Sequence, residues 1–287
     1  MTKKLLTTTE IQIILTNYRI GTLVHKQYIG VTIENQNYKI ITTKGTYLLK
    51  FFEDADVPAK DIVFQNGLMA HLRAKGVKVP KVITTRTSET TTLFQGKPVS
   101  LYEFVQGAHI TKFSKKNLAS IAKEIAKLHT VLLDYKLEKK HKNSYYSDQA
   151  QGYVKGKKLR SMLIHADLGT DNILMKGDKV SGIIDFGNVH WGYLVNDLAT
   201  FALVFLSKQN LLCLPIFFAE YQKHLTLTED EKASLHFFMS EHAKGVLRWT
   251  EQKLKQKQGK QLALVRKTKI VFTKKLELLK QNQIGIL

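Results

Sequence analysis

Apolar positions along the chain follow a strand period first and a helix period later. Between residues 28 and 52, β-branched and aromatic residues predominate, and Lys44-Gly45 interrupts them. This pattern predicts strands over 37–43 and 46–52 joined by a hairpin turn, and a further strand over 98–104. Alternation within 46–52 places Lys50 on one face of its strand. The first part of the chain is therefore expected to form a β-sheet.

Helical spacing dominates the rest of the chain. Thr7 and Glu10 have capping-box spacing and predict a short helix that ends near residue 17. A second helix is expected over 61–75, with Gly76 past its end. A third, over 114–133, has Ser114 or Asn117 as its cap. Further helices are expected over 196–206, 211–225, 228–254 and 262–279.

The residues with the clearest chemical pattern lie between these helices. His165 stands two positions before Asp167, and Asn172 follows five positions later. After a short turn, residues 180–184 predict a buried strand that delivers Asp185 at its end. A hairpin would bring the three oxygen-bearing side chains of Asp167, Asn172 and Asp185 together.

This group of side chains suits phosphoryl transfer. Mg²⁺ prefers oxygen ligands and takes only one or two from protein, while phosphate and water complete its shell. Asn172 and Asp185 would hold the metal, and Asp167 would remain for the attacking hydroxyl. The alternative is an ordinary β-hairpin whose Asp and Asn side chains cap turns.

The motif His165-x-Asp167-(x)4-Asn172, followed by Ile184-Asp185-Phe186-Gly187, resembles the aminoglycoside phosphotransferase and choline kinase superfamily of protein-kinase-like enzymes. Protein kinases usually carry Arg between the His and the Asp. Ala166 stands there in this chain, which favours the small-molecule branch.

Within that branch, several segments resemble the type II homoserine kinases. They are residues 18–23, 34–38, 67–72, 165–168 with 171–172, and 177–182. Two features differ from that group. The Asp-Phe-Gly sequence is more like the aminoglycoside enzymes, and the stretch 135–160 is shorter and more basic than expected.

The resemblance implies an α+β, two-lobed protein-kinase-like fold. Residues 1–104 would form a small β-rich N-lobe, and residues 105–287 a larger helical C-lobe. The cofactors would be ATP and Mg²⁺. Asp167 would act as the catalytic base, and Asn172 and Asp185 as the metal ligands.

Nucleotide-binding residues are expected in the N-lobe. Lys50 would contact the α- and β-phosphates, or it is an edge-strand lysine that extends to water. Asn35 and Asn37 lie where protein kinases have a glycine-rich loop and would cover the phosphates. The backbone of Glu103, Phe104 and Val105 would hydrogen-bond adenine.

Three more positions follow from the resemblance. Many relatives have a glutamate that pairs with the strand lysine, but Gln65 occupies the matching place and cannot form an ion pair. Asp197 matches an aspartate that braces the catalytic loop, although Asn196 or Asp197 could instead cap a helix. His129 is expected to be a packed structural residue.

The formal net charge of +20 limits the acceptor. Lysines are dense in 135–160 and 244–280, and such a surface repels polycations such as aminoglycosides. The expected acceptor is a small hydroxylated metabolite, with a homoserine-like amino alcohol favoured over choline, a sugar or hydroxylysine. A basic module that binds RNA or an anionic surface is the alternative from another class, but no interleaving of aromatic and basic residues supports it. The lysines could also simply be solvated faces.

Cysteine content and hydropathy indicate the compartment. Cys213 is the single cysteine, which excludes an intramolecular disulfide and fits a reducing environment. No signal peptide or run long enough to span a membrane is recognised. The sequence therefore predicts a cytoplasmic protein and leaves its oligomeric state open.

Overall fold

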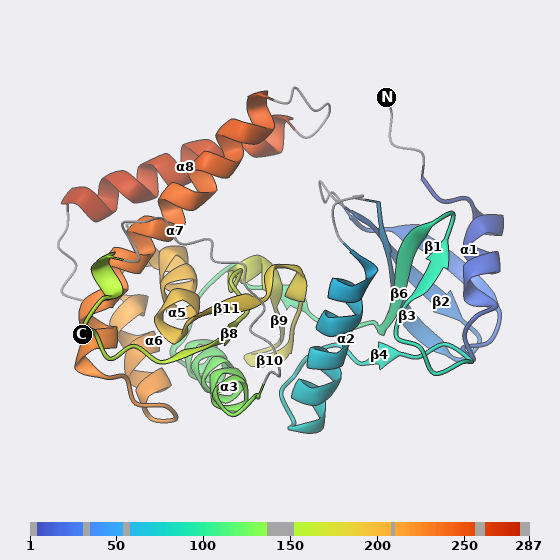
Figure 1. Cartoon of the computed structure of the whole chain (residues 1–287), viewed down its shortest axis with the longest axis horizontal. Helices are drawn as coiled ribbons and strands as arrows, with labels where there is room; N and C mark the ends of the chain where they lie inside the picture. Colours follow the sequence, from blue (N-terminus) through green and yellow to red (C-terminus); the bar gives the residue numbers. More distant parts are fainter. Residues whose placement is uncertain are drawn as a thin grey trace. The chain divides into compact units, whose positions relative to one another are not determined.

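The computed structural model describes residues 5–30, 35–53, 58–136, 152–207, 210–255 and 262–281. The chain forms two compact units, Met1–Gln106 and Gly107–Leu287. Figure 1 shows the sheet of the first unit and the helices of the second. A β-rich first unit and a mainly helical second unit confirm the predicted α+β class.

An antiparallel sheet forms most of the first unit. Its strands are β1 (Leu23–Tyr28), β2 (Asn35–Thr42), β3 (Gly45–Phe52), β4 (Val82–Ile83), β5 (Thr92–Phe94) and β6 (Lys97–Glu103). They run in the order β1-β2-β3-β6-β4, with β5 also paired to β6. The predicted hairpin is confirmed, since Thr42 pairs with Gly45 across its turn. β1 begins five residues before the predicted β-region because Leu23–Tyr28 pairs with β2 despite weak alternation.

One face of this sheet carries the core of the first unit. Tyr38, Leu49 and Leu101 pair across β2, β3 and β6, so they share a face, and all three are buried. Helix α1 (Thr8–Leu15) adds Ile11 and Ile14 to this core. The capping box predicted for Thr7 and Glu10 is present.

Helix α2 (Ala59–Ala74) lies on the other face of the sheet. Its Asn66 side chain donates to Ser100 Oγ on β6 at 3.0 Å and accepts from the Tyr102 hydroxyl at 2.8 Å. The helix ends as predicted, with Gly76 at φ +77°, in the left-handed region that favours glycine.

The second unit combines two small sheets with long and short helices. The strands are β7 (Ala108–His109), β8 (Ser161–Ile164), β9 (Ile173–Lys176), β10 (Lys179–Ile183) and β11 (His190–Tyr193). The α-helices are α3 (Lys115–Leu133), α5 (Leu194–Ala202), α6 (Cys213–Gln222), α7 (Glu229–Lys255) and α8 (Leu262–Gln281), and the short 3₁₀ helices are η1 (Thr170–Asn172), η2 (Phe186–Asn188) and η3 (Leu203–Phe205). The sheets have the orders β10-β9-β7 and β11-β8.

The structure confirms a predicted cap of one helix in this unit and corrects the predicted start of another. Ser114 caps α3, and Asn117 is the reciprocal partner in its capping box. Helix α5 begins at Leu194 after Tyr193, so neither Asn196 nor Asp197 caps it. Residues 137–151 of the basic stretch and 256–261 of the second lysine-rich region lie outside the described residues.

The two small sheets define the position of the motif residues. Strand β8 leads into the loop 165–172, and β9 leads out of it. An ion pair to a buried carboxylate fixes the residue before β8: the partly exposed Arg160 donates to both carboxylate oxygens of Glu231 on α7, at 2.8 and 2.6 Å. Among the described residues, no helix has the length and apolar character needed to cross a membrane.

Candidate active site

Two backbone hydrogen bonds hold the start of the loop 165–172. The Asp197 carboxylate, fully buried on α5, accepts from the N–H groups of His165 and Ala166, each at 2.7 Å. Ala166 has φ +65°, a left-handed conformation that is unfavourable for alanine. Hydrogen bonds to a charged acceptor are strong, so Asp197 stabilises this conformation. Such backbone conformations concentrate at functional sites.

His129 completes the surroundings of Asp197. Burial by itself would raise the pKa of Asp197, but the nearby His129 ring and the backbone donors hold it below its ordinary value. His129 Nε2 lies 3.5 Å from the carboxylate, and Nδ1 lies 2.8 Å from the Tyr221 hydroxyl. His129 is completely buried, in keeping with the packed, structural position expected for it.

The His165 ring connects the loop to the end of β10. The Asp167 N–H donates to Nδ1 at 3.3 Å, and Nε2 lies 2.9 Å from the carbonyl oxygen of Ile184. The two ring nitrogens thus contact the backbone of the loop on one side and the end of β10 on the other. The ring also packs on Phe186, with centroids 4.7 Å apart. Sequence reasoning assigned no role to this ring.

Asp167 and Asn172 are directly hydrogen-bonded. Asn172 Nδ2 donates to the Asp167 carbonyl at 2.8 Å and to its carboxylate at 3.0 Å. The backbone carbonyl of Asn172 accepts from the N–H of Ile184 at 2.9 Å, and Asp185 is the next residue along the chain. Asp185 has φ +64°. The predicted motif residues therefore lie close together within one unit.

Electrostatics set the proton affinity of Asp167. Burial raises its pKa to about 6, and the negative charge of Asp185 acts in the same direction. Hydrogen bonding to Asn172 and the presence of His165 partly offset these effects. Asp167 is thus ionised at neutral pH but basic enough to take a proton.

The donor set fits a divalent cation. The Nδ2 atom of Asn172 is committed to Asp167, which leaves Oδ1 as an acceptor, and the two carboxylates repel each other in the absence of a cation. No cluster of three or more His, Cys, Asp or Glu side chains suited to a metal occurs in the described part of the chain. Magnesium does not require such a cluster, because it commonly retains water and phosphate ligands.

The predicted phosphate-binding residues of the first unit share one sheet face. Lys50 on β3 pairs with Asn37 on β2 and with Ser100 on β6, and Asn35 pairs with Phe52. The Lys50 ammonium lies 5.3 Å from the centre of the Phe52 ring. Asn37 Oδ1 is buried and accepts no hydrogen bond from any described residue. This face is opposite to the core that contains α1.

Helix α2 lies over the same face. Gln65, at the place where many relatives have glutamate, is half-buried on α2. The next residue, Asn66, fixes the helix to the sheet through Ser100, the direct neighbour of Lys50. Sequence reasoning missed Asn66, although an asparagine within an apolar helical pattern is a signal for a buried polar contact.

Two of the three backbone N–H groups predicted to contact adenine already donate hydrogen bonds within the protein. The N–H of Glu103 donates to the Lys81 carbonyl at 2.8 Å, and the N–H of Phe104 donates to the Thr46 carbonyl at 3.1 Å. The Glu103 side chain pairs with Arg73 at 3.1 Å. Among the described residues the N–H of Val105 donates no hydrogen bond, so it is the remaining donor of the three.

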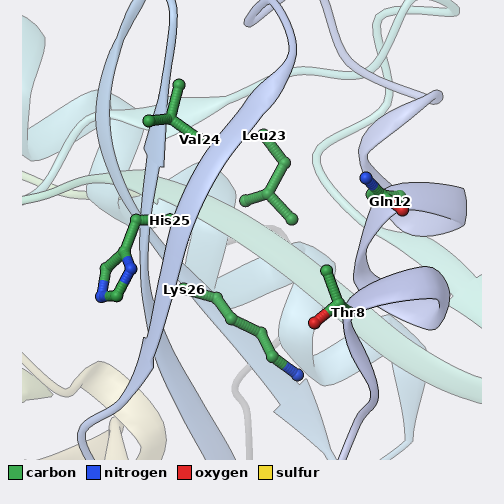
Figure 2. Close-up of a pocket in the computed structure, with 6 residues that line it drawn as sticks. All are labelled: Thr8, Gln12, Leu23, Val24, His25 and Lys26. Carbon is green, nitrogen blue, oxygen red and sulfur yellow. The ribbon is translucent and has the colours of Figure 1, made fainter.

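A hollow of about 480 Å³ on the first unit lies apart from these residues (Figure 2). It is lined by Thr8, Gln12, Leu23, Val24, His25 and Lys26. The Lys26 ammonium donates to the Leu6 carbonyl at 2.7 Å. None of the predicted site residues lines this hollow, and its lysine is already engaged.

Comparison with known families gives an independent result. The profile of the phosphotransferase enzyme family matches residues 27–155 and 148–238. A homoserine kinase of Nitrobacter winogradskyi is 31% identical over 195 residues, which cover 59% of this chain and 60% of that protein. A homoserine kinase of Rhodopseudomonas palustris gives the same values. The match thus spans about 60% of the length of these relatives.

Solved structures share the fold at low sequence identity. A microcompartment-associated aminopropanol kinase has a TM-score of 0.76 at 16% identity, over 98% of this chain and 99% of that chain. The amicoumacin kinase hAmiN, in complex with AMP-PNP and Ca²⁺, has a TM-score of 0.75 at 14% identity, over 96% and 94%. These likenesses confirm the predicted kinase-like fold.

Proposed function

Because the chain belongs to the phosphotransferase enzyme family, as its motifs predicted, we propose that it transfers the γ-phosphoryl group of ATP to a hydroxyl of a small metabolite. A homoserine-like amino alcohol is the favoured acceptor. The observation that carries this proposal is the hydrogen-bonded pair of Asp167 and Asn172, with the charge of Asp185 beside it.

Asp167 is proposed as the catalytic base. Its backbone N–H is held by His165, and one carboxylate oxygen is held by Asn172, so the carboxylate has a fixed direction. It would orient the acceptor hydroxyl and take its proton as the oxygen attacks phosphorus. A pKa raised by burial to about 6 suits this role, since the group is ionised at neutral pH and remains a usable base.

Asn172 and Asp185 are proposed to hold Mg²⁺, which when bound neutralises charge on the transferring phosphoryl group. In Asn172, Nδ2 donates to Asp167, so Oδ1 is the side-chain atom that remains available for a metal. For Asp185, the hydrogen bond between Ile184 and Asn172 fixes the preceding peptide. The chain thereby separates the proposed base from the proposed metal ligands.

The first unit is proposed to bind the nucleotide. Lys50 would contact the phosphates, with Asn35 and Asn37 beside it on the same sheet face. The N–H of Val105, with neighbouring carbonyl groups, would hydrogen-bond adenine. Gln65 cannot supply the ion pair that many relatives use to position the lysine, so the neighbouring strand residues would position Lys50 instead.

The nature of the acceptor rests on charge and on relatives. The homoserine kinases and the aminopropanol kinase are named for small amino alcohols. A net charge of +20 disfavours polycationic acceptors. Choline, a sugar or hydroxylysine are the other acceptors of the same reaction class.

The test is ADP release from MgATP with a panel of acceptors: homoserine, 3-aminopropanol, choline, hydroxylysine, a sugar and an aminoglycoside. The Asp167→Asn protein serves as the control. We expect acceptor-dependent turnover that the variant loses. Full activity of the variant would refute the assigned base. Absence of both turnover and nucleotide binding, together with salt-sensitive RNA binding, would favour the non-enzymatic alternative.

A further inference from the structure

Helix α8 carries a lysine for which the described residues supply no ion pair. Lys275 is partly buried, and it forms no hydrogen bond or ion pair with any described residue. Its ammonium lies 5.0 Å from the centre of the Phe272 ring. Burial lowers the pKa of Lys275, while the nearby Asp171 carboxylate of the loop 165–172 acts to raise it. A half-buried ammonium without an anion is energetically unfavourable.

A continuous series of contacts connects Lys275 to the proposed active site. α8 and α7 pack against each other within the second unit (Figure 1). The Phe272 ring lies 6.2 Å from the His242 ring on α7, and His242 Nδ1 lies 3.2 Å from Thr200 Oγ1 on α5. Thr200 lies one turn beyond Asp197, which holds the loop 165–172. The packing of α8 on α7, and of α7 on α5, therefore fixes the position of Lys275 within the second unit.

The two titratable neighbours of Lys275, His242 and Asp171, leave its ammonium available to bind an anion. Burial lowers the pKa of His242 to about 4, so this ring is neutral at physiological pH. Asp171 is exposed and acts on Lys275 through its charge, without an ion pair between the two among the described contacts. The charge of Asp171 affects the pKa of both Lys275 and Asp167, so both groups lie within electrostatic reach of this loop residue.

We infer that Lys275 binds a carboxylate of the acceptor and that the acceptor is a hydroxylated amino acid or hydroxy acid. This inference rests on the proposed function. The carboxylate would pair with the ammonium of Lys275, and the hydroxyl would face Asp167. Lys275 is therefore a specificity residue that fixes one end of the acceptor. It takes no part in proton transfer.

The experiment uses two acceptors that differ in one group. Homoserine and 3-aminopropanol have the same hydroxyl and amine, and only homoserine carries the carboxylate. We compare the wild type with Lys275→Met, with Lys275→Arg, and with Lys274→Met as the matched control on the exposed neighbour. Thermal unfolding of each protein shows whether the variants remain folded.

We expect Lys275→Met to raise KM for homoserine about tenfold or more, the size of a lost charge-assisted contact. KM for 3-aminopropanol and for ATP should stay the same, and Lys275→Arg should recover part of the loss. Lys274→Met should behave as the wild type.

Three results would overturn the inference. An equal rise in KM for both acceptors would make Lys275 structural, and a rise in KM for ATP would make it a nucleotide contact. Turnover of carboxylate-free acceptors alone would overturn the inference but leave the proposed function standing. No turnover of any acceptor by the wild type would overturn both.

Discussion

Replacing Asp167 by asparagine should lower turnover by orders of magnitude and at the same time stabilise the nucleotide-free protein. The carboxylate is partly buried next to the charge of Asp185, which raises its pKa from 3.8 to about 6. A folded-state pKa above the unfolded value means that the ionised group destabilises the fold. Asparagine keeps the shape and an acceptor oxygen for Asn172 but carries no charge.

The magnitude follows from the pKa. A rise of about 2 units, at 1.36 kcal/mol per unit, corresponds to about 3 kcal/mol at pH 7.5. The sign fixes the pH dependence. Near pH 4 the folded protein carries a protonated Asp167, so the variant should have little advantage. The difference in free energy of unfolding should grow between pH 4 and 6 and then stay constant.

The assay is urea unfolding of the wild type and the variant at pH 4, 5, 6 and 7.5, without nucleotide or Mg²⁺. About 3 kcal/mol corresponds to a rise in Tm of roughly 6–12 °C for a unit of this size. Asp171→Asn, an exposed change in the same loop, is the matched control and should alter stability by less than about 0.5 kcal/mol. Equal stability of wild type and Asp167→Asn at pH 7.5 would refute the reasoning. Turnover by Asp167→Asn should fall by a factor of about 10² to 10⁴.

Three further changes test the surroundings of the loop. Asp185→Asn should weaken Mg²⁺-dependent nucleotide binding in a calorimetric titration, and unchanged metal dependence would contradict its role as a ligand. Asp197→Asn removes a charged acceptor of two backbone N–H groups and should lower the free energy of unfolding by about 3 kcal/mol in urea, and kcat with it. Arg160→Met should destabilise by about 3–5 kcal/mol because Glu231 is buried, and Arg160→Met with Glu231→Gln should recover much of the loss. If the double variant is as unstable as the single one, the loss does not come from the unpaired carboxylate.

Local sequence rules predicted the elements that depend on local interactions. The hairpin at Lys44-Gly45, the capping box at Thr7 and the end of α2 at Gly76 were predicted correctly. Each depends on residues a few positions apart, where spacing and backbone preference are sufficient. The motif residues Asp167 and Asn172 were also brought together as their spacing suggested.

Contacts between distant segments could not be predicted in this way. The short strand β11 pairs with β8, which lies about thirty residues earlier, and neither strand has a distinctive alternation. The left-handed backbone at Ala166 has no signal in an alanine, because it is imposed by Asp197 on α5. The place of Lys275 beside the loop likewise depends on the packing of three helices.

The loop 165–172 combines these two kinds of information. Spacing within the motif supplies the reactive groups, and hydrogen bonds from inside and outside the loop hold them in an unfavourable conformation. Ala166 and Asp185 both adopt left-handed backbone conformations, and Asp167 and Asp185 place two negative charges close together. Asp197 and the His165 ring supply hydrogen bonds that hold the backbone of this region in place. Such an arrangement favours the binding of a cation and of a proton donor from outside the chain, because the groups that receive them are already oriented before binding.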